Sequence, residues 1–368
     1  MQFIDLKTQY NLLKDEIDSN IKEVLSHGQY IMGPEVGKLE NNLANFIGSN
    51  YAITCSSGTD ALLMALMSLD VQKGDYVLTT PFTYIATAEA IRLLGAIPEF
   101  VDIDPNTFNM DVNKVKDKID KNPNKYKFIM PVNIFGAPID YNAINELKQN
   151  HNIVVIEDAA QSFGALYDDK KSGILGDIGC TSFYPAKPLG CYGDAGAIFT
   201  NDESIANKLK SIREHGAGKD KYNNVRLGLN GRMDTIQAAI LLPKLKIFKD
   251  EFEKRNVVAS SYMQKISKRF KVQSVIELAT SSWAQFSFLC DDESHRDKVV
   301  QKLKNNNIPT AIYYVTPLHL QEMFNDLGYS DGDFQVTEDI CSRILSLPMH
   351  PYLLEDEVDK VCSLILED

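Results

Sequence analysis

The segment Ile153-Val154-Val155-Ile156-Glu157-Asp158-Ala159-Ala160-Gln161 decides the fold class of this 368-residue chain. Its first half has the length and the apolar composition of a buried strand, and two acidic residues close it. In open α/β sheets, ligands bind just beyond the carboxyl ends of the strands. The segment therefore predicts a strand of such a sheet that ends, at Asp158, beside a ligand site.

Similar apolar runs occur on both sides of this segment, and stretches with the apolar periodicity of amphipathic helices separate several of them. The predicted strands are 51–55, 76–79, 97–101, 127–132, 153–157, 180–184 and 195–200. The predicted helices are 7–26, 35–47, 60–69, 86–94, 141–150 and 202–213. Strands that alternate with helices indicate βαβ units, so we expect an α/β fold with a mostly parallel or mixed sheet.

The pattern changes after Gln237. A long helical stretch reaches about residue 268, and beyond it the predicted strands are fewer, at 283–290 and 310–314, with a helix at 295–305. We therefore expect a large domain over residues 1–245, which includes an N-terminal helical arm, and a smaller α+β domain over residues 246–368. No Gly/Ser-rich linker separates them, so we expect the two domains to pack tightly.

Composition and charge exclude several functional classes. Hydrophobic residues make up 44% of the chain and charged residues 24%, as in a soluble protein with a large core. A net charge of -12 argues against a nucleic-acid partner, which would need clustered Lys and Arg. No apolar stretch is long enough to span a membrane, and the N-terminus does not resemble a signal peptide. The six cysteines lack a CxxC pair, so we expect free thiols, no metal site and a cytoplasmic location.

Three local patterns carry candidate chemistry. Ser57-Gly58-Thr59 lies between a predicted strand and a predicted helix. The free backbone N–H groups of such a helix start suit a phosphate, although an ordinary turn with Thr59 as the N-cap would have the same pattern. Asp158 closes an apolar strand, so its carboxylate needs a cationic partner such as a protonated pyridine nitrogen, unless it only caps a helix.

The third pattern is a lysine between two prolines, in Tyr184-Pro185-Ala186-Lys187-Pro188. The prolines exclude a regular helix or a central strand. Apolar surroundings lower the pKa of an amine and make it nucleophilic toward a carbonyl carbon, although a plain surface-loop lysine fits the same residues.

Taken together, these motifs resemble the sugar aminotransferases of the DegT/DnrJ/EryC1/StrS type. The resemblance covers essentially the whole chain. It rests on Gly33-Pro34-Glu35-Val36, Ser57-Gly58-Thr59-Asp60-Ala61-Leu62, Pro81-Phe82-Thr83-Tyr84-Ile85-Ala86-Thr87, Glu157-Asp158-Ala159-Ala160-Gln161, Asn230-Gly231-Arg232-Met233 and on Ser182 five residues before Lys187. It implies the aspartate aminotransferase-like (type I) fold, with a mostly parallel seven-stranded sheet and a smaller C-terminal domain, and a homodimer with shared active sites.

The resemblance also implies a cofactor, pyridoxal 5'-phosphate (PLP), and a role for each matching residue. Lys187 would hold PLP as a Schiff base and move the proton, and Asp158 would pair with the pyridine nitrogen. The remaining cofactor contacts would be Gln161 to the ring hydroxyl, Tyr84 against the ring face, and Gly58, Thr59 and Ser182 around the phosphate, with Asn230 reaching the phosphate in the neighbouring subunit.

The segment 188–196 resembles enzymes that aminate C3 of a nucleotide sugar, above all the bacterial transaminases of UDP-2-acetamido-2-deoxy-3-oxo-glucuronic acid, with L-glutamate as amine donor and O-antigen as the product's destination. Arg232 matches the arginine that binds the uronic acid carboxylate, although it can also be structural. Tyr313 stands where the family often has a substrate-binding histidine, and His319 can line the cleft or lie at the surface. A dTDP-3-keto-6-deoxyhexose and a 4-keto sugar nucleotide are the alternative substrates.

Three alternative functions are less compatible with the residues. PLP-dependent sugar dehydratases of this fold carry histidine in place of the Schiff-base lysine, whereas this chain has Lys187. A non-catalytic relative that only regulates or binds would be favoured by the loss of Lys187, Asp158 or Gln161, and all three are present. A plain nucleotide-binding module would need a GxGxxG or P-loop motif, which the chain lacks.

Overall fold

A seven-stranded sheet forms the centre of the protein. The computed structural model describes residues 1–220 and 222–367. The strand order is β1-β9-β8-β5-β4-β2-β3, and β9 alone runs antiparallel to its neighbours. The strands are β1 (Tyr51–Cys55), β2 (Tyr76–Thr79), β3 (Ile97–Phe100), β4 (Tyr126–Ile129), β5 (Val154–Asp158), β8 (Ile178–Ser182) and β9 (Gly196–Thr200). The α/β class and the mostly parallel sheet expected from the sequence are confirmed.

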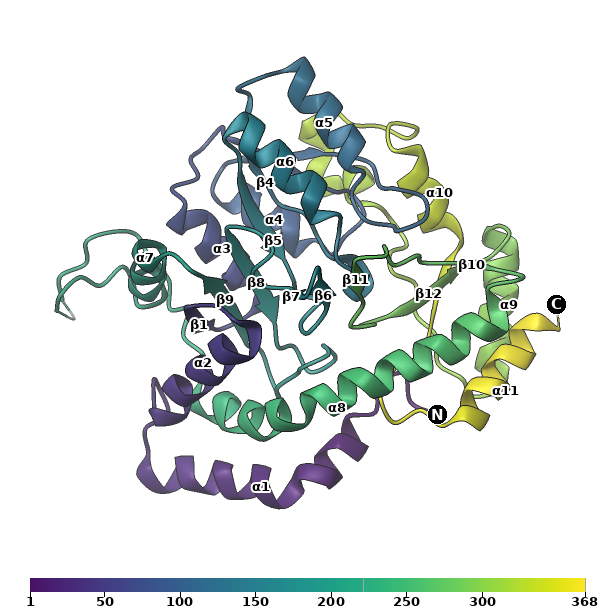
Figure 1. Ribbon diagram of the computed structural model, residues 1–368, viewed down its shortest axis with the longest axis horizontal. Coiled ribbons are helices and arrows are strands. Elements are labelled where there is room, and N and C mark those ends of the chain that lie inside the picture. Colours follow the sequence, from purple (N-terminus) through teal and green to yellow (C-terminus); the bar gives the residue numbers. More distant parts are fainter. Residues whose placement is uncertain (221, 368) are drawn as a thin grey trace.

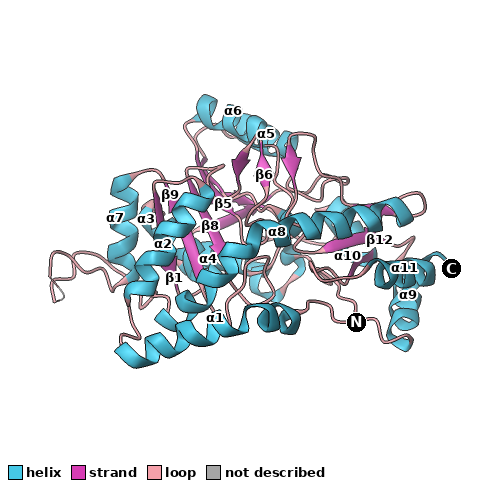
Figure 2. Ribbon diagram, turned by 60° about the horizontal axis from the view of Figure 1, so that its bottom comes forward, coloured by secondary structure: helices cyan, strands magenta, loops and turns pink. Residues whose placement is uncertain are grey.

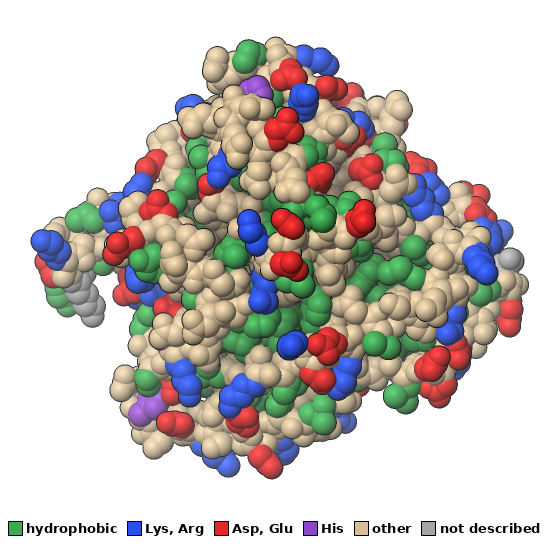
Figure 3. Space-filling view, in the orientation of Figure 1, with side chains coloured by type: hydrophobic (Ala, Val, Ile, Leu, Met, Phe, Trp, Pro, Cys, Tyr) green, Lys and Arg blue, Asp and Glu red, His purple; other side chains and the backbone are tan. Residues whose placement is uncertain are grey.

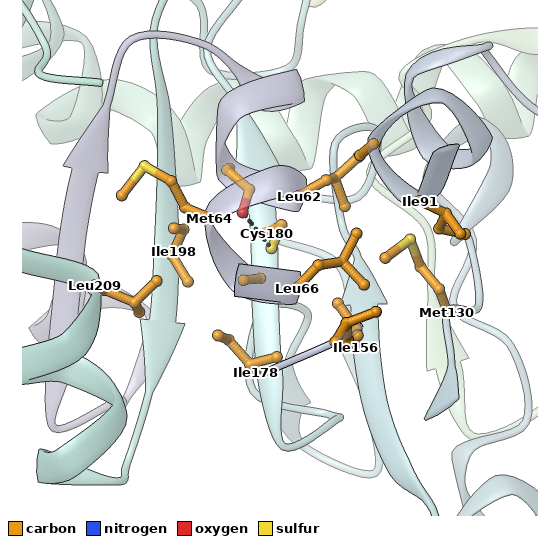
Figure 4. Close-up of a cluster of buried hydrophobic side chains, with 14 of the residues drawn as sticks. Leu62, Met64, Leu66, Ile91, Met130, Ile156, Ile178, Cys180, Ile198 and Leu209 are labelled. Carbon is orange, nitrogen blue, oxygen red and sulfur yellow. Dashed lines mark hydrogen bonds between the residues drawn. The ribbon is translucent and has the colours of Figure 1, made fainter. Parts of the chain in front are cut away.

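Helices cover both faces of this sheet, because neighbouring residues of a strand point to opposite faces. On β5, Ile156 packs toward α3 (Gly58–Ser68), α4 (Ala86–Leu93) and α7 (Glu203–Arg213). Val155 packs toward α5 (Val112–Lys121) and α6 (Tyr141–His151) on the opposite face. Figure 4 shows the first of these layers, in which Leu62 and Leu66 of α3 lie over Ile178 and Cys180 of β8. The sheet is therefore buried on both sides.

Three long helices complete the second face and frame the N-terminal side. α1 (Leu6–His27) and α2 (Pro34–Ile47) both pack on α8 (Thr235–Ile266), and Figure 1 shows α8 running from below the large sheet to the C-terminal part of the molecule. The domain boundary that we predicted at residues 245 and 246 lies inside this continuous helix. That boundary stays a proposal, and α8 is the element that the two proposed domains share.

The C-terminal part is built on a second sheet, of three antiparallel strands in the order β10-β12-β13. Its core is formed with α8, α9 and α11 (Figure 2). The elements are β10 (Lys271–Val272), β12 (Phe286–Leu289), α9 (Glu293–Asn305), α10 (Gln335–Arg343), β13 (Ile344–Leu347) and α11 (Glu355–Leu366), with short 3-10 helices at Leu318–Leu320 and Glu322–Leu327. A further three-stranded sheet joins β11 (Ala279–Thr280) to β6 (Leu166–Tyr167) and β7 (Lys170–Lys171), and a third 3-10 turn covers Ile134–Gly136.

One sequence expectation for this part needs correction. The strand expected at 310–314 is wrong, since only Ala311 makes a single bridge, to Ser346. The second long strand of the small sheet is instead β13, which pairs with β12 over four residues.

No helix among the described residues has the length and apolar character of a membrane span. In Figure 3, hydrophobic side chains gather across the middle of one face, with Lys, Arg, Asp and Glu scattered around them.

Candidate active site

The carboxyl ends of β1, β5 and β8 meet on one edge of the large sheet, and the start of α3 lies against them. Ser57 is the N-cap of α3, because its Oγ accepts the backbone N–H of Asp60 at 3.0 Å. The alternative in which Thr59 is the N-cap is therefore wrong. A Cβ on Gly58 would lie 2.6 Å from Cβ of Ser182, so only glycine lets the helix start approach β8 this closely. The free N–H groups of the helix start and the Ser182 hydroxyl thus lie together.

Asp158 ends β5 and is 3% exposed. Its Oδ2 accepts a hydrogen bond from Oγ1 of Thr87 at 2.8 Å, and its Oδ1 accepts the backbone N–H of Ala160 at 3.1 Å. Burial raises the pKa of Asp158, and the Thr87 hydroxyl opposes that rise. The residues that follow form turns and no helix, so the alternative of a helix-capping aspartate is wrong. Among the described residues, no basic side chain forms an ion pair with this carboxylate.

Thr87 was not singled out from the sequence. It stands on α4, 71 residues before Asp158, and is 1% exposed. Its hydroxyl also exchanges a hydrogen bond of 3.1 Å with the hydroxyl of Thr83, which lies four residues earlier, before the start of α4. The only signal in the sequence was that the motif 81–87 contains two hydroxyl side chains four residues apart, the spacing that places side chains on one face of a helix turn.

Lys187 lies in a tight loop that begins after β8. The loop is closed at its base by the Cys191 N–H, which donates to the Phe183 carbonyl at 2.8 Å. Inside it, the Lys187 N–H donates to the Tyr184 carbonyl at 2.8 Å. The lysine is partly buried, so it is no ordinary surface residue. Burial lowers its pKa, and the negative charge of Asp158 opposes that effect, which places the amine and the carboxylate in one electrostatic environment.

Gln161 is fixed by two neighbours. Its Oε1 accepts the backbone N–H of Phe135 at 2.7 Å, and its Nε2 donates to the hydroxyl of Tyr314 at 3.1 Å. The second amide hydrogen is left to donate to a ligand. Tyr314, which sequence reasoning did not single out, therefore holds the orientation of the amide. Tyr84 is 60% exposed, as a ring that is to stack on a bound ligand must be.

The predicted substrate residues divide into two groups. The segment 230–232 lies beside the α3 turn, because the Ser56 N–H donates to the Gly231 carbonyl at 3.0 Å. Asn230 is exposed and accepts a hydrogen bond from Arg232, whose Nε is buried without a partner among the described residues. Arg232 thus retains hydrogen-bonding capacity.

Tyr313 and His319 lie in the C-terminal part of the chain and not in the segment beside the α3 turn. Tyr313 is partly buried beside Tyr314, and burial raises its pKa, with the charge of Tyr184 adding to the effect. His319 is 1% exposed, and its Nε2 lies 2.9 Å from Oε1 of Glu338. This burial contradicts the surface placement considered for His319, whereas its role as a residue that lines the cleft stays a prediction. Its ring packs on Phe334 and helps to hold the C-terminal segment.

These residues can bind a phosphate, stabilise a buried positive charge and attack a carbonyl carbon. The helix start and Ser182 suit the phosphate. No described residue forms an ion pair with the buried Asp158 carboxylate, and a protonated ring nitrogen would supply one. The Lys187 amine has a lowered pKa and no hydrogen-bond partner among the described residues. Each of the three chemical parts of PLP therefore has a matching group at this edge of the sheet.

Comparison with known proteins agrees with this assignment of chemistry. Residues 11–366 match the DegT/DnrJ/EryC1/StrS aminotransferase family. The chain is 45% identical to the UDP-2-acetamido-2-deoxy-3-oxo-D-glucuronate aminotransferase of Pseudomonas aeruginosa, over 99% of both chains. A DegT DnrJ EryC1 StrS aminotransferase from Brucella abortus has the same fold, with a TM-score of 0.95, 44% identity and coverage of 100% of this chain and 99% of its own. NtdA from Bacillus subtilis, solved with bound cofactor PMP, is 30% identical with a TM-score of 0.88, covering 100% of this chain and 83% of its own. The chain therefore belongs to the DegT/DnrJ/EryC1/StrS aminotransferase family.

Proposed function

We propose that this aminotransferase uses PLP to move an amino group from L-glutamate to the 3-keto carbon of UDP-2-acetamido-2-deoxy-3-oxo-glucuronic acid. The observation that carries the choice of substrate is the 45% identity, over 99% of both chains, to the enzyme that bears this substrate in its name. The segment 188–196 and Arg232 support the same choice. The product would serve bacterial O-antigen synthesis, and we place the enzyme in the cytoplasm.

The residues of the site divide the work as follows. PLP, when bound, draws electrons away from the substrate carbon and carries the amino group between the two substrates. Lys187 would hold the cofactor through its amine, and the same amine, when free, would carry a proton between the substrate carbon and the C4′ carbon of the cofactor. Asp158 would keep the ring nitrogen protonated, because a buried carboxylate favours a proton-bearing partner. The start of α3 and Ser182 would bind the phosphate.

The substrate proposal is tested with purified enzyme, L-glutamate and a panel of 3-keto and 4-keto sugar nucleotides, with product mass as the readout. We expect amination of the 3-keto uronic acid. Amination of only a 4-keto, 6-deoxy sugar would refute the proposal. Lys187→Ala should abolish turnover, and a Lys187→Ala protein that still turned over would contradict the PLP mechanism itself.

Arg232 offers a sharper test of the uronic acid. A guanidinium binds a carboxylate through two parallel hydrogen bonds, so its removal should matter only for a substrate with the C6 carboxylate. We therefore expect Arg232→Gln to raise KM for the 3-keto uronic acid and to leave KM unchanged for the analogue with a C6 hydroxymethyl group. An equal loss for both sugars would assign Arg232 to the structure of the segment and not to sugar recognition.

We also propose a homodimer in which the two subunits share active sites. Figure 1 shows the segment after α7 extending away from the body of the molecule, and its side chains Val225 and Leu227 are 54% and 87% exposed. Such exposed apolar residues on an extension suit burial against a second copy. Mixing Lys187→Ala with Asn230→Ala protein tests the sharing. Activity should return in hybrid dimers, because one of their sites then has both residues, and no return of activity would refute the shared site.

A further inference from the structure

Lys244 is a fully buried lysine that the proposed mechanism does not use. It lies in α8, directly after Pro243, and its side chain is 0% exposed. Its Nζ donates to the Gly190 carbonyl at 2.7 Å and lies 3.9 Å from the centre of the Tyr192 ring. Among the described residues, no carboxylate forms an ion pair with it. Burying an ammonium group is costly, so the carbonyl and the aromatic face must together stabilise the charge.

Both contacts of Lys244 are on the loop that carries Lys187. Gly190 lies three residues after Lys187, and a Cβ there would lie 2.4 Å from the Pro185 carbonyl oxygen. The backbone is therefore folded tightly on itself, with carbonyl oxygens gathered at the point where the Lys244 ammonium donates. Such a cluster of partial negative charge is stabilised by a cation.

α8 binds the same loop at a second point. The Oε1 of Gln237 accepts the Tyr192 N–H at 3.0 Å. Gln237 and Lys244 are seven residues apart, which is about two turns of helix, so they share one face of α8. Gln237 and Lys244 thus attach the C-terminal base of the Lys187 loop, on either side of Cys191, to α8.

We propose that Lys244 is a positioning residue that holds the Lys187 loop so that the Lys187 amine meets the carbonyl carbon of the cofactor. Lys244 itself contacts neither cofactor nor substrate. This inference rests on the proposed PLP function. The loss of Lys244 should therefore have a selective effect. It should displace the Lys187 amine, which bonds to the aldehyde of PLP, and leave the phosphate turn and Asp158 intact.

The test compares PLP with pyridoxine 5'-phosphate, which has the same ring and phosphate but no aldehyde. Lys244→Met removes the charge and the donor while keeping most of the side-chain volume. We expect it to weaken PLP binding about tenfold or more, the range for losing a hydrogen bond to a charged group, and to leave the Kd of pyridoxine 5'-phosphate unchanged. Lys246→Met is the matched control, since Lys246 stands on the same helix but is exposed and pairs with Glu16. We expect it to change neither affinity.

A Lys244→Met protein that lost affinity for both ligands equally, or for neither, would overturn the inference. Combining Lys244→Met with Lys187→Ala should add no further loss of PLP affinity, because the two changes act on one interaction. Should Lys244→Met not fold, Gln237→Leu removes the other attachment of the loop and should give the same aldehyde-selective loss. Wild-type protein that bound no PLP would refute the proposed function instead, so the two failures are distinguishable.

Discussion

Replacing Thr87 with valine tests whether a hydrogen bond from Thr87 controls the charge of the Asp158 carboxylate. Valine has nearly the shape of threonine, so the main change is the loss of the hydroxyl that donates to Oδ2 of Asp158 at 2.8 Å. Both residues are buried, and the Ala160 N–H is then the remaining hydrogen-bond donor to the carboxylate among the described residues. A hydrogen bond to a charged group contributes about 1.5–3 kcal/mol. The pKa of Asp158, already raised by burial, should therefore rise further when the Thr87 hydroxyl is lost.

The consequence is a weaker and more pH-dependent cofactor site. A carboxyl group with a raised pKa keeps its proton to higher pH, so the ionised form that pairs with a protonated ring nitrogen is lost earlier as the pH falls. We expect Thr87→Val to raise the Kd of PLP about tenfold to a hundredfold near neutral pH, and the loss to grow toward acid pH. Equilibrium dialysis over a range of pH values measures this.

Two matched variants separate the hydroxyl from packing. Thr87→Ser keeps the donor and should retain a pH profile close to that of the wild type. Thr83→Val removes only the hydroxyl that exchanges a hydrogen bond with Thr87, and should have a smaller effect. A Thr87→Val protein whose PLP affinity had the wild-type dependence on pH would show that this hydrogen bond does not control the Asp158 charge.

Two further predictions concern packing and acid stability. Gly58→Ala places a Cβ 2.6 Å from Cβ of Ser182, so the start of α3 and β8 must move apart. We expect equilibrium dialysis to show weaker binding of both PLP and pyridoxine 5'-phosphate. We expect urea unfolding to show that the overpacking lowers the free energy of unfolding by about 1–3 kcal/mol. An unchanged affinity would contradict the phosphate assignment. Asp102 accepts hydrogen bonds from Thr337 and Lys114, and although burial raises its pKa, these donors hold it below the usual value. Its contribution to stability is therefore fully present above its unfolded pKa of about 4 and is lost as the pH falls from there through the lower folded pKa. The wild type should thus lose more stability than Asp102→Asn on acidification in thermal unfolding. Equal losses would contradict this.

The sequence was sufficient for those parts of the site that depend on local patterns. Gly58, Asp158 and Lys187 each stand where an apolar run ends, and strand ends can be located from composition and periodicity alone. The large sheet was predictable for the same reason. The strand at 310–314 was not, because β-like composition on a short segment does not decide whether it finds a partner strand, and β13 takes that place beside β12.

Contacts between distant residues could not be predicted from one sequence. The Thr87 hydroxyl on α4 donates to the Asp158 carboxylate at the end of β5. The Lys244 side chain on α8 donates to the Gly190 carbonyl, which is 54 residues away in the chain. Lysine side chains are usually exposed to solvent, so the burial of Lys244 could not be predicted from its residue type. The burial of His319 was not predicted for a similar reason, since its partner Glu338 is 19 residues away in the chain.

The same helix that supports Lys187 also links the site to the C-terminal part of the chain. Beyond Lys244, the side chain of Asn256 in α8 donates to the Ser281 carbonyl at 3.3 Å. The next residue, Ser282, donates through its hydroxyl to the backbone carbonyl of Gln161 at 2.8 Å. One face of α8 therefore holds the Lys187 loop, while the segment bound further along it holds Gln161. Both attachments therefore depend on one continuous helix, α8. The proposed boundary at residues 245 and 246 lies between these two attachments, directly after Lys244 and before Asn256.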